Sequence, residues 1–130
     1  MRYVIDSYAW LEYFMGTAAG EKIRRVIDSI EDEKLTPTIC VAEIYAKTLR
    51  VEGTEKAELQ RAFIKSRSAM VSLTEEIAVE AAKLDVEMKK KVPGWGLADS
   101  IVLGTARRKK ARVVTGDRHF LDLPETEFIE

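Results

Sequence analysis

The spacing of apolar positions changes along the chain, and this change predicts strands that alternate with helices. Short runs rich in Val and Ile predict buried strands, whereas apolar residues three and four positions apart predict helices with one buried face. The expected strands cover residues 2–5, 34–36, 69–73, 112–114 and 127–129. The expected helices cover residues 8–15, 17–32, 39–51, 54–67, 74–90 and 97–109, and a helical turn is expected at 119–122.

Strands joined through helices favour right-handed crossovers and parallel pairing. We therefore expect one α/β domain over residues 1–130, with a central, mostly parallel β-sheet of four to five strands flanked by helices on both faces. No repeat, linker or low-complexity segment interrupts the pattern.

The composition agrees with such a domain. The chain has 130 residues, of which 46% are hydrophobic and 33% charged, so it can bury a core without a disulfide or a structural zinc ion. Its single cysteine and single histidine exclude an internal disulfide and a Cys/His zinc site. The first six residues do not resemble a signal peptide, and no apolar run reaches 18 residues, so we expect a cytoplasmic protein without a membrane span.

Four carboxylates lie just after expected strands or near the starts of expected helices. Asp6 directly follows the first expected strand, and Asp117 lies three residues past the fourth. Glu43 and Asp99 lie near the starts of helices that follow loops. Ligands of open α/β sheets bind beyond the carboxyl ends of the strands, so all four side chains are expected at that edge.

Each carboxylate also has a simpler interpretation. Asp6 and Asp117 can cap the helix or turn that follows them. Glu43 stands four residues before Lys47, in the favourable order for a surface ion pair on a helix. Asp99 is harder to explain in this way, because its spacing places it beside an apolar stripe, where a carboxylate needs a partner, a metal or strong hydrogen bonds.

A pocket of several carboxylates indicates a particular chemistry. Clustered negative charges repel one another, and a hard divalent cation such as Mg²⁺ or Mn²⁺ removes that repulsion. Such an ion activates water and stabilises the leaving oxygen when a phosphodiester is hydrolysed. An acidic site without a convincing histidine base therefore favours metal-dependent phosphodiester hydrolysis.

These residues resemble a known family along nearly the whole chain. The marks are Val-Ile-Asp-Ser at 4–7, Val-Ala-Glu-Ile at 41–44, Leu-Ala-Asp-Ser at 97–100 and Val-Val-Thr-Gly-Asp-Arg-His-Phe at 113–120. Each motif alone is weak, but the four in this order resemble the PIN-domain ribonucleases, and most closely the VapC-like toxins of type II toxin–antitoxin pairs.

The resemblance implies a set of roles. Asp6, Glu43, Asp99 and Asp117 match the acidic metal-binding residues of the family, and Ser7 and Thr115 match small hydroxyl residues that support them. The implied activity is Mg²⁺- or Mn²⁺-dependent cleavage of single-stranded RNA, leaving a 5′-phosphate and a 3′-hydroxyl. The implied partners are a second copy in a homodimer and a small antitoxin protein that occupies the acidic groove. His119 departs from the pattern, since many members have another acidic residue there, and Ser100 replaces a frequent small apolar residue.

Other residues are candidates for contact with RNA. Arg107 and Arg108 belong to a basic run that is either a solvated helix end or a phosphate-binding surface near the metal site. Arg118 and His119 belong to the last motif, and the histidine is more typical of a structural or substrate-contact role than of a general base. Trp95 lies in the loop before Asp99, where it either packs over the loop or stacks on a base.

Although the net charge is only −1, a basic segment of the chain is followed by an acidic one. Residues 83–112 contain nine basic and three acidic side chains, whereas residues 113–130 contain one basic and five acidic. This distribution is compatible with an acidic pocket beside a basic surface.

Two alternatives to a toxin stay open: a PIN-domain nuclease of RNA processing, and a PIN-like interaction module without catalysis. A phosphoacceptor receiver domain is rejected, because the middle strand is followed by Thr74 instead of an aspartate.

Overall fold

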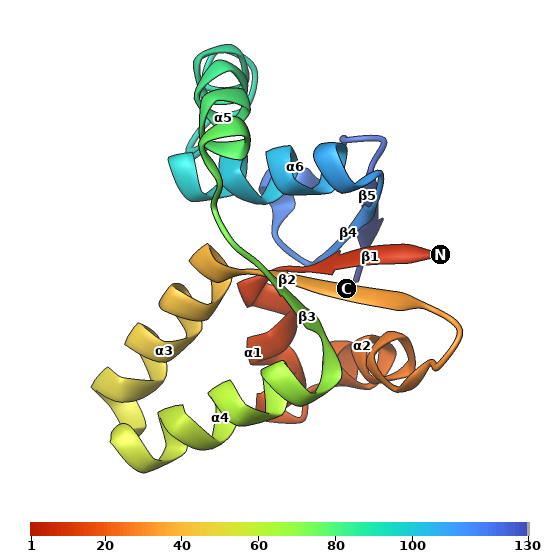
Figure 1. Ribbon diagram of the computed structural model, residues 1–130, viewed down its shortest axis with the longest axis vertical. Coiled ribbons are helices and arrows are strands. Elements are labelled where there is room, and N and C mark those ends of the chain that lie inside the picture. Colours follow the sequence, from red (N-terminus) through yellow and green to blue (C-terminus); the bar gives the residue numbers. More distant parts are fainter. Residues whose placement is uncertain (130) are drawn as a thin grey trace.

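A computed structural model describes residues 1–129, and its centre is a sheet of five parallel strands (Figure 1). The strands are β1 (Arg2–Ile5), β2 (Glu33–Pro37), β3 (Ala69–Val71), β4 (Arg112–Thr115) and β5 (Thr126–Phe128). The helices are α1 (Ser7–Met15), α2 (Ala18–Asp28), α3 (Thr38–Glu52), α4 (Thr54–Arg67), α5 (Glu75–Met88) and α6 (Leu97–Lys109), and a 3₁₀ turn, η1, spans Arg118–Phe120. The strand order is β3-β2-β1-β4-β5, so the expected α/β fold with a parallel sheet is confirmed.

Alternation along the strands builds a separate core on each face of the sheet. Val4 pairs with Leu35 and Val113 on the neighbouring strands, and these three side chains pack with α5 and α6. Ile5 and Val114 point to the other face, where they pack with residues of α1, α2, α3 and α4. Figure 1 shows the same division, with α5 and α6 on one side of the sheet and α1 to α4 on the other.

The second helix is shorter than its apolar pattern predicts, and the prediction of a helix over residues 17–32 is wrong at its end. The helix ends at Asp28, and the side chain of Ile30 is 97% exposed, although its spacing places it on the apolar stripe. The backbone N–H of Glu33 donates to Met1 at 2.9 Å as β2 begins. The chain must leave the helix before this point to bring β2 beside β1.

The third strand is also shorter than the expected 69–73. Val71 pairs with Pro37, the last residue of β2, so Ser72 and Leu73 have no strand beside them to extend the ladder. The last strand is shifted by one residue from the expected 127–129, because Thr126 pairs with Val113. Within residues 1–129, the structure has no helix with the length and apolar character needed to cross a bilayer.

Candidate metal and nucleic-acid site

The four carboxylates singled out by the sequence lie at one edge of the sheet. Asp6 follows β1 and Asp117 follows β4, while Glu43 lies in the second turn of α3, which continues directly from β2. Asp99 lies in the first turn of α6, and this helix runs back toward the start of β4, so its first turn reaches the carboxyl edge. Their charges act on one another, since Asp117 and Glu43 raise the pKa of Asp6, and Asp99 and Asp117 raise that of Glu43.

Asp6 is the most deeply buried member, with 5% of its surface exposed. Its Oδ1 accepts from the backbone N–H of Ala9 at 2.9 Å, so the helix-capping interpretation is correct as well. Burial raises the pKa of Asp6 to about 7, although hydrogen bonds from Thr115 and Ala9 act in the opposite direction. A cap alone does not need a charge that the core disfavours, so Asp6 is a candidate for a further role at this edge.

Glu43 faces the site from α3 and does not pair with Lys47 in the part of the chain that the structure describes. The Ser7 hydroxyl donates to Glu43 Oε1 at 3.0 Å, which fixes the carboxylate toward the site and lowers its pKa. Partial burial of the carboxyl group is nevertheless the largest influence, and the net pKa is raised. Burial also raises the pKa of the Cys40 thiol, and the charges of Asp6 and Glu43 raise it further.

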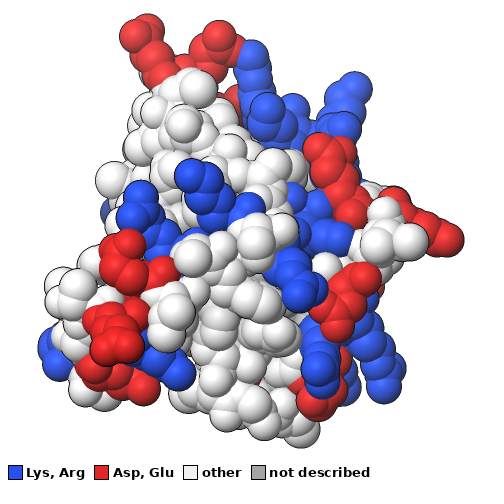
Figure 2. Space-filling view, turned by 60° about the horizontal axis from the view of Figure 1, so that its bottom comes forward, with Lys and Arg blue, Asp and Glu red and all other residues white. Residues whose placement is uncertain are grey.

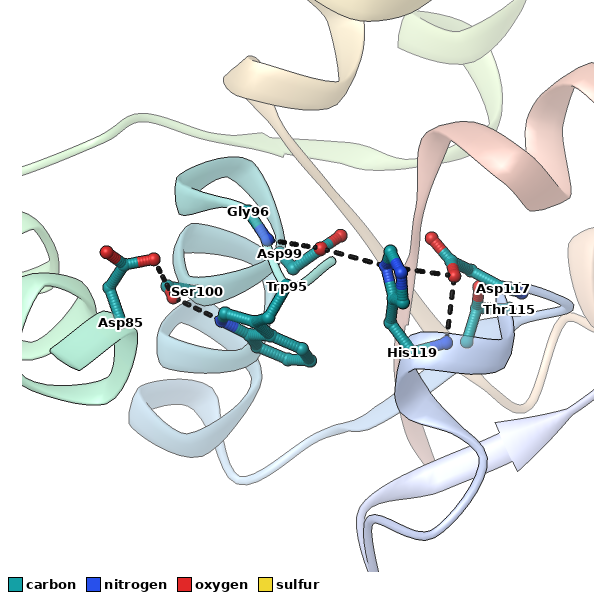
Figure 3. Close-up of polar contacts among 8 residues, drawn as sticks. All are labelled: Asp85, Trp95, Gly96, Asp99, Ser100, Thr115, Asp117 and His119. Atoms are coloured by element: carbon teal, nitrogen blue, oxygen red, sulfur yellow. Dashed lines mark hydrogen bonds and ion pairs between the residues drawn. The ribbon is translucent and has the colours of Figure 1, made fainter. Parts of the chain in front are cut away.

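Asp99, Asp117 and His119 form the most compact part of the site (Figure 3). His119 Nδ1 lies 3.2 Å from Asp99 Oδ2 and 3.4 Å from Asp117 Oδ1. Backbone N–H groups position both carboxylates: Gly96 donates to Asp99 Oδ2 at 3.0 Å, and His119 donates to Asp117 Oδ1 at 2.9 Å. Partial burial is the main cause that raises the pKa of Asp99, and the charge of Asp117 adds to it.

Thr115 supports this geometry from the end of β4. Its side-chain oxygen accepts from the backbone N–H of Asp117 at 2.9 Å, and its hydroxyl also lowers the pKa of Asp6. One fully buried side chain therefore contacts two of the four acidic residues. The positions of Ser7 and Thr115 agree with the supporting roles expected for them.

Trp95 packs inside the protein, which agrees with the packing alternative and not with stacking of its ring on a base. Only 3% of its surface is exposed, and its ring lies 5.2 Å from that of Phe120. Its indole N–H donates to Ser100 Oγ at 2.7 Å, and the Ser100 hydroxyl donates to Asp85 Oδ1 at 3.2 Å (Figure 3). This network was not predicted from the sequence, because Asp85 belongs to another helix than Ser100. The one signal of a buried polar contact was Ser100 itself, which stands where an apolar residue is frequent.

Arg107 and Arg108 lie away from the carboxylates, which favours the solvated helix end over a phosphate-binding surface near the metal site. They are in the last turn of α6, eight and nine residues past Asp99, which corresponds to about 12 Å or more along the helix axis. Arg107 pairs with Glu125 at 2.6 Å, and Arg108 pairs with Glu76. Figure 2 shows one face of the molecule on which basic and acidic side chains lie next to one another around a central uncharged region.

Arg118 is the candidate RNA-binding arginine that does lie at the site. It follows Asp117 directly and begins η1, and its side chain is exposed. His119 is next in the chain, with 35% of its side chain exposed, so both can contact a molecule bound over the carboxylates.

The donor set at this edge suits a divalent cation. One ligand atom each from Asp99, Asp117 and His119 lies within 4.8 Å of the other two. Carboxylate oxygens are the preferred ligands of Mg²⁺ and Mn²⁺. Burial is the main cause that raises the pKa values of Asp6, Glu43 and Asp99, and the charges of neighbouring carboxylates raise them further. A bound cation would offset both effects, so these residues fit such an ion.

Comparison with known families decides the classification. Residues 3–125 match the family described as PIN domain. The chain belongs to the PIN domain family. By sequence, this PIN domain has no match among curated proteins.

Solved structures share the fold of this PIN domain. A chain of VapBC2 from Rickettsia felis, solved with a DNA fragment from its promoter, superimposes with a TM-score of 0.79 at 15% identity over 100% of both chains. VapC20 from Mycobacterium tuberculosis, described as a toxin that cleaves the sarcin-ricin loop, gives 0.80 at 16% identity over 98% of this chain and 99% of its own. A chain of VapBC-1 from nontypeable Haemophilus influenzae superimposes with a TM-score of 0.74 at 17% identity, over 100% of this chain and 98% of its own. The likeness extends over whole chains and shows that the fold is that of VapC toxins.

Proposed function

We propose that this PIN domain is a Mg²⁺- or Mn²⁺-dependent endoribonuclease that hydrolyses phosphodiester bonds of single-stranded RNA. The observation that carries the proposal is the meeting of four carboxylates from separate segments at one edge of the sheet, with raised pKa values for three of them. A structural role does not require carboxylates from separate segments in one place, whereas a divalent cation that binds phosphate is held by such oxygen ligands.

The residues of the site would have different roles. Asp99, Asp117 and the more distant Asp6 and Glu43 would hold the ion, while Ser7 and Thr115 orient their carboxylates. A bound cation supplies an acidified water and neutralises charge on the phosphate. Water attacks phosphorus and the P–O3′ bond breaks, leaving a 5′-phosphate and a 3′-hydroxyl. Arg118 would contact the RNA backbone beside the reacting bond.

The biological role that we propose is that of the toxin in a toxin–antitoxin pair. The support is the PIN family membership together with the fold shared over full length with VapC toxins. In this role the protein forms a homodimer and is neutralised by a small antitoxin. A processing nuclease would share the chemistry but would not arrest growth when expressed without a partner.

Cleavage of an end-labelled single-stranded RNA tests the catalytic proposal. We expect cleavage with Mn²⁺ or Mg²⁺, none with EDTA, and a loss of at least about 100-fold in Asp99→Asn, which corresponds to about 3 kcal/mol of transition-state stabilisation. Asp122→Asn, an exposed aspartate near the same turn, is the matched control and should keep full activity. Full activity in EDTA would refute metal dependence, and a silent protein that binds the ion would support the interaction module.

Expression in cells tests the toxin role separately. We expect the wild-type protein to arrest growth and Asp99→Asn to be harmless at the same protein level. Light scattering should give the mass of two chains. Active RNA cleavage without growth arrest would favour the processing nuclease.

A further inference from the structure

His119 is the single histidine of the chain, and its imidazole faces the carboxylates of Asp99 and Asp117. Nδ1 is the nitrogen that points to Asp99 Oδ2 and Asp117 Oδ1 (Figure 3). The imidazole nitrogen is a different type of donor from the carboxylate oxygens beside it.

The two separations from His119 Nδ1 to the carboxylate oxygens are close to those of neighbouring ligands around one ion, and the three donor atoms all lie within 4.8 Å of one another. Two neighbouring ligands of an octahedral ion with bonds of about 2.1 Å lie about 3.0 Å apart. The 3.2 Å and 3.4 Å separations from Nδ1 to the two carboxylates are slightly longer than this edge. A single ion can therefore contact Nδ1 and both carboxylates with small adjustments of the side chains.

The surroundings of His119 hold the ring in this orientation. Its Nε2 faces Gly94, where an added Cβ would approach that nitrogen to 3.1 Å, and the φ of +80° at Gly94 also favours glycine. The ring of Trp95 lies 6.5 Å from the imidazole and is itself anchored through its N–H to Ser100. The backbone N–H of His119 donates to Asp117 Oδ1, so the same residue contacts this carboxylate through its backbone and its ring.

We propose that His119 Nδ1 is a direct nitrogen ligand of the catalytic ion and makes the site prefer Mn²⁺ to Mg²⁺. This inference rests on the proposed metal-dependent function and adds the choice of metal to it. Mg²⁺ binds oxygen ligands almost exclusively, whereas imidazole favours transition-metal ions. Replacing an acidic ligand by imidazole lowers the affinity for Mg²⁺ more than that for Mn²⁺, and it leaves one negative charge fewer in the site.

Pulsed EPR of the Mn²⁺-loaded full chain, prepared without a polyhistidine tag, tests the ligand directly. Because the chain has one histidine, a ¹⁴N coupling of the strength of a bound imidazole can come only from His119. We expect this coupling in the wild type and in Asp122→Asn, and its absence in His119→Gln. Mn²⁺ bound to the wild type without the coupling would overturn the inference and leave the metal site itself standing.

Calorimetric titration with Mn²⁺ and Mg²⁺ tests the preference, with circular dichroism to verify that each variant folds. We expect His119→Asp to lower the ratio of Mn²⁺ to Mg²⁺ affinity by about tenfold, because it replaces the nitrogen donor by an oxygen donor that Mg²⁺ accepts as well. An unchanged ratio in His119→Asp would overturn the inference. A wild-type chain that binds neither ion would overturn both the inference and the proposed metal dependence.

Discussion

Asp6 places a carboxylate in the core, and replacing it by asparagine should stabilise the metal-free protein. The Asn side chain keeps the shape of Asp and an oxygen that can accept from Ala9 N–H, as Asp6 Oδ1 does at 2.9 Å. The substitution therefore removes the buried charge while it preserves the helix cap and the packing beside Thr115.

The size and the pH dependence of this effect follow from the pKa. Burial raises the pKa of Asp6 from 3.8 to about 7. The folded protein thus keeps a proton that the unfolded chain releases, so stability present below pH 4 is lost as the pH rises to 7. The full shift corresponds to roughly 4 kcal/mol at pH 8, and to roughly 2 kcal/mol at pH 5.

Urea unfolding in EDTA at pH 5 and pH 8 measures this difference. We expect Asp6→Asn to exceed the wild type in the free energy of unfolding at both pH values, with the larger gain at pH 8. Asp122→Asn, which alters an exposed aspartate, should change stability by less than about 0.5 kcal/mol at either pH. Adding Mn²⁺ should stabilise the wild type and stabilise Asp6→Asn much less.

Two results would refute this reasoning. A metal-free Asp6→Asn protein less stable than the wild type at pH 8 would show that the carboxylate contributes to folding through contacts that asparagine cannot make. A stability gain that is equal at pH 5 and pH 8 would show that the titration of Asp6 is not its cause.

Three further predictions concern residues around the site. Ser7→Ala should weaken Mn²⁺ binding by about tenfold, because the carboxylate of Glu43 loses a hydrogen bond that holds it and lowers its pKa; affinity equal to wild type would contradict this. Trp95→Phe should lower the free energy of unfolding by about 2 kcal/mol in urea, since it removes a buried donor, and an unchanged value would show that the indole N–H is dispensable. The double change Arg107→Ala/Arg108→Ala should leave RNA cleavage unchanged, and a large loss of activity would show that this helix end binds RNA.

The carboxylates could be selected from the sequence by two rules, one on the ends of parallel strands and one on charged side chains beside apolar stripes. Asp6 and Asp117 follow strands of a parallel sheet, and the carboxyl ends of such strands share one edge. Asp99 stood out because its spacing places a charged side chain beside an apolar stripe, where it needs a partner. The structure provides the Gly96 N–H and His119 as partners.

The features that sequence reasoning misjudged depend on distances through space. The basic run that includes Arg107 follows Asp99 closely in sequence, but a helix of 13 residues carries it to the opposite edge of the sheet. Trp95 lies in a loop rich in glycine, which is typical of exposed segments, yet Phe120 and Ser100 bury it from two other segments. Ile30 continued a helical pattern that strand pairing interrupts.

Anomalous diffraction from a crystal soaked in Mn²⁺ tests the central claim most directly, namely that the four carboxylates form one metal site. We expect a peak at the carboxyl edge of the sheet, bound by Asp99 and Asp117 and linked directly or through water to Asp6 and Glu43. The peak should vanish in Asp99→Asn crystals soaked in the same way. Full Mn²⁺ occupancy elsewhere on the protein, with none among these carboxylates, would contradict the claim.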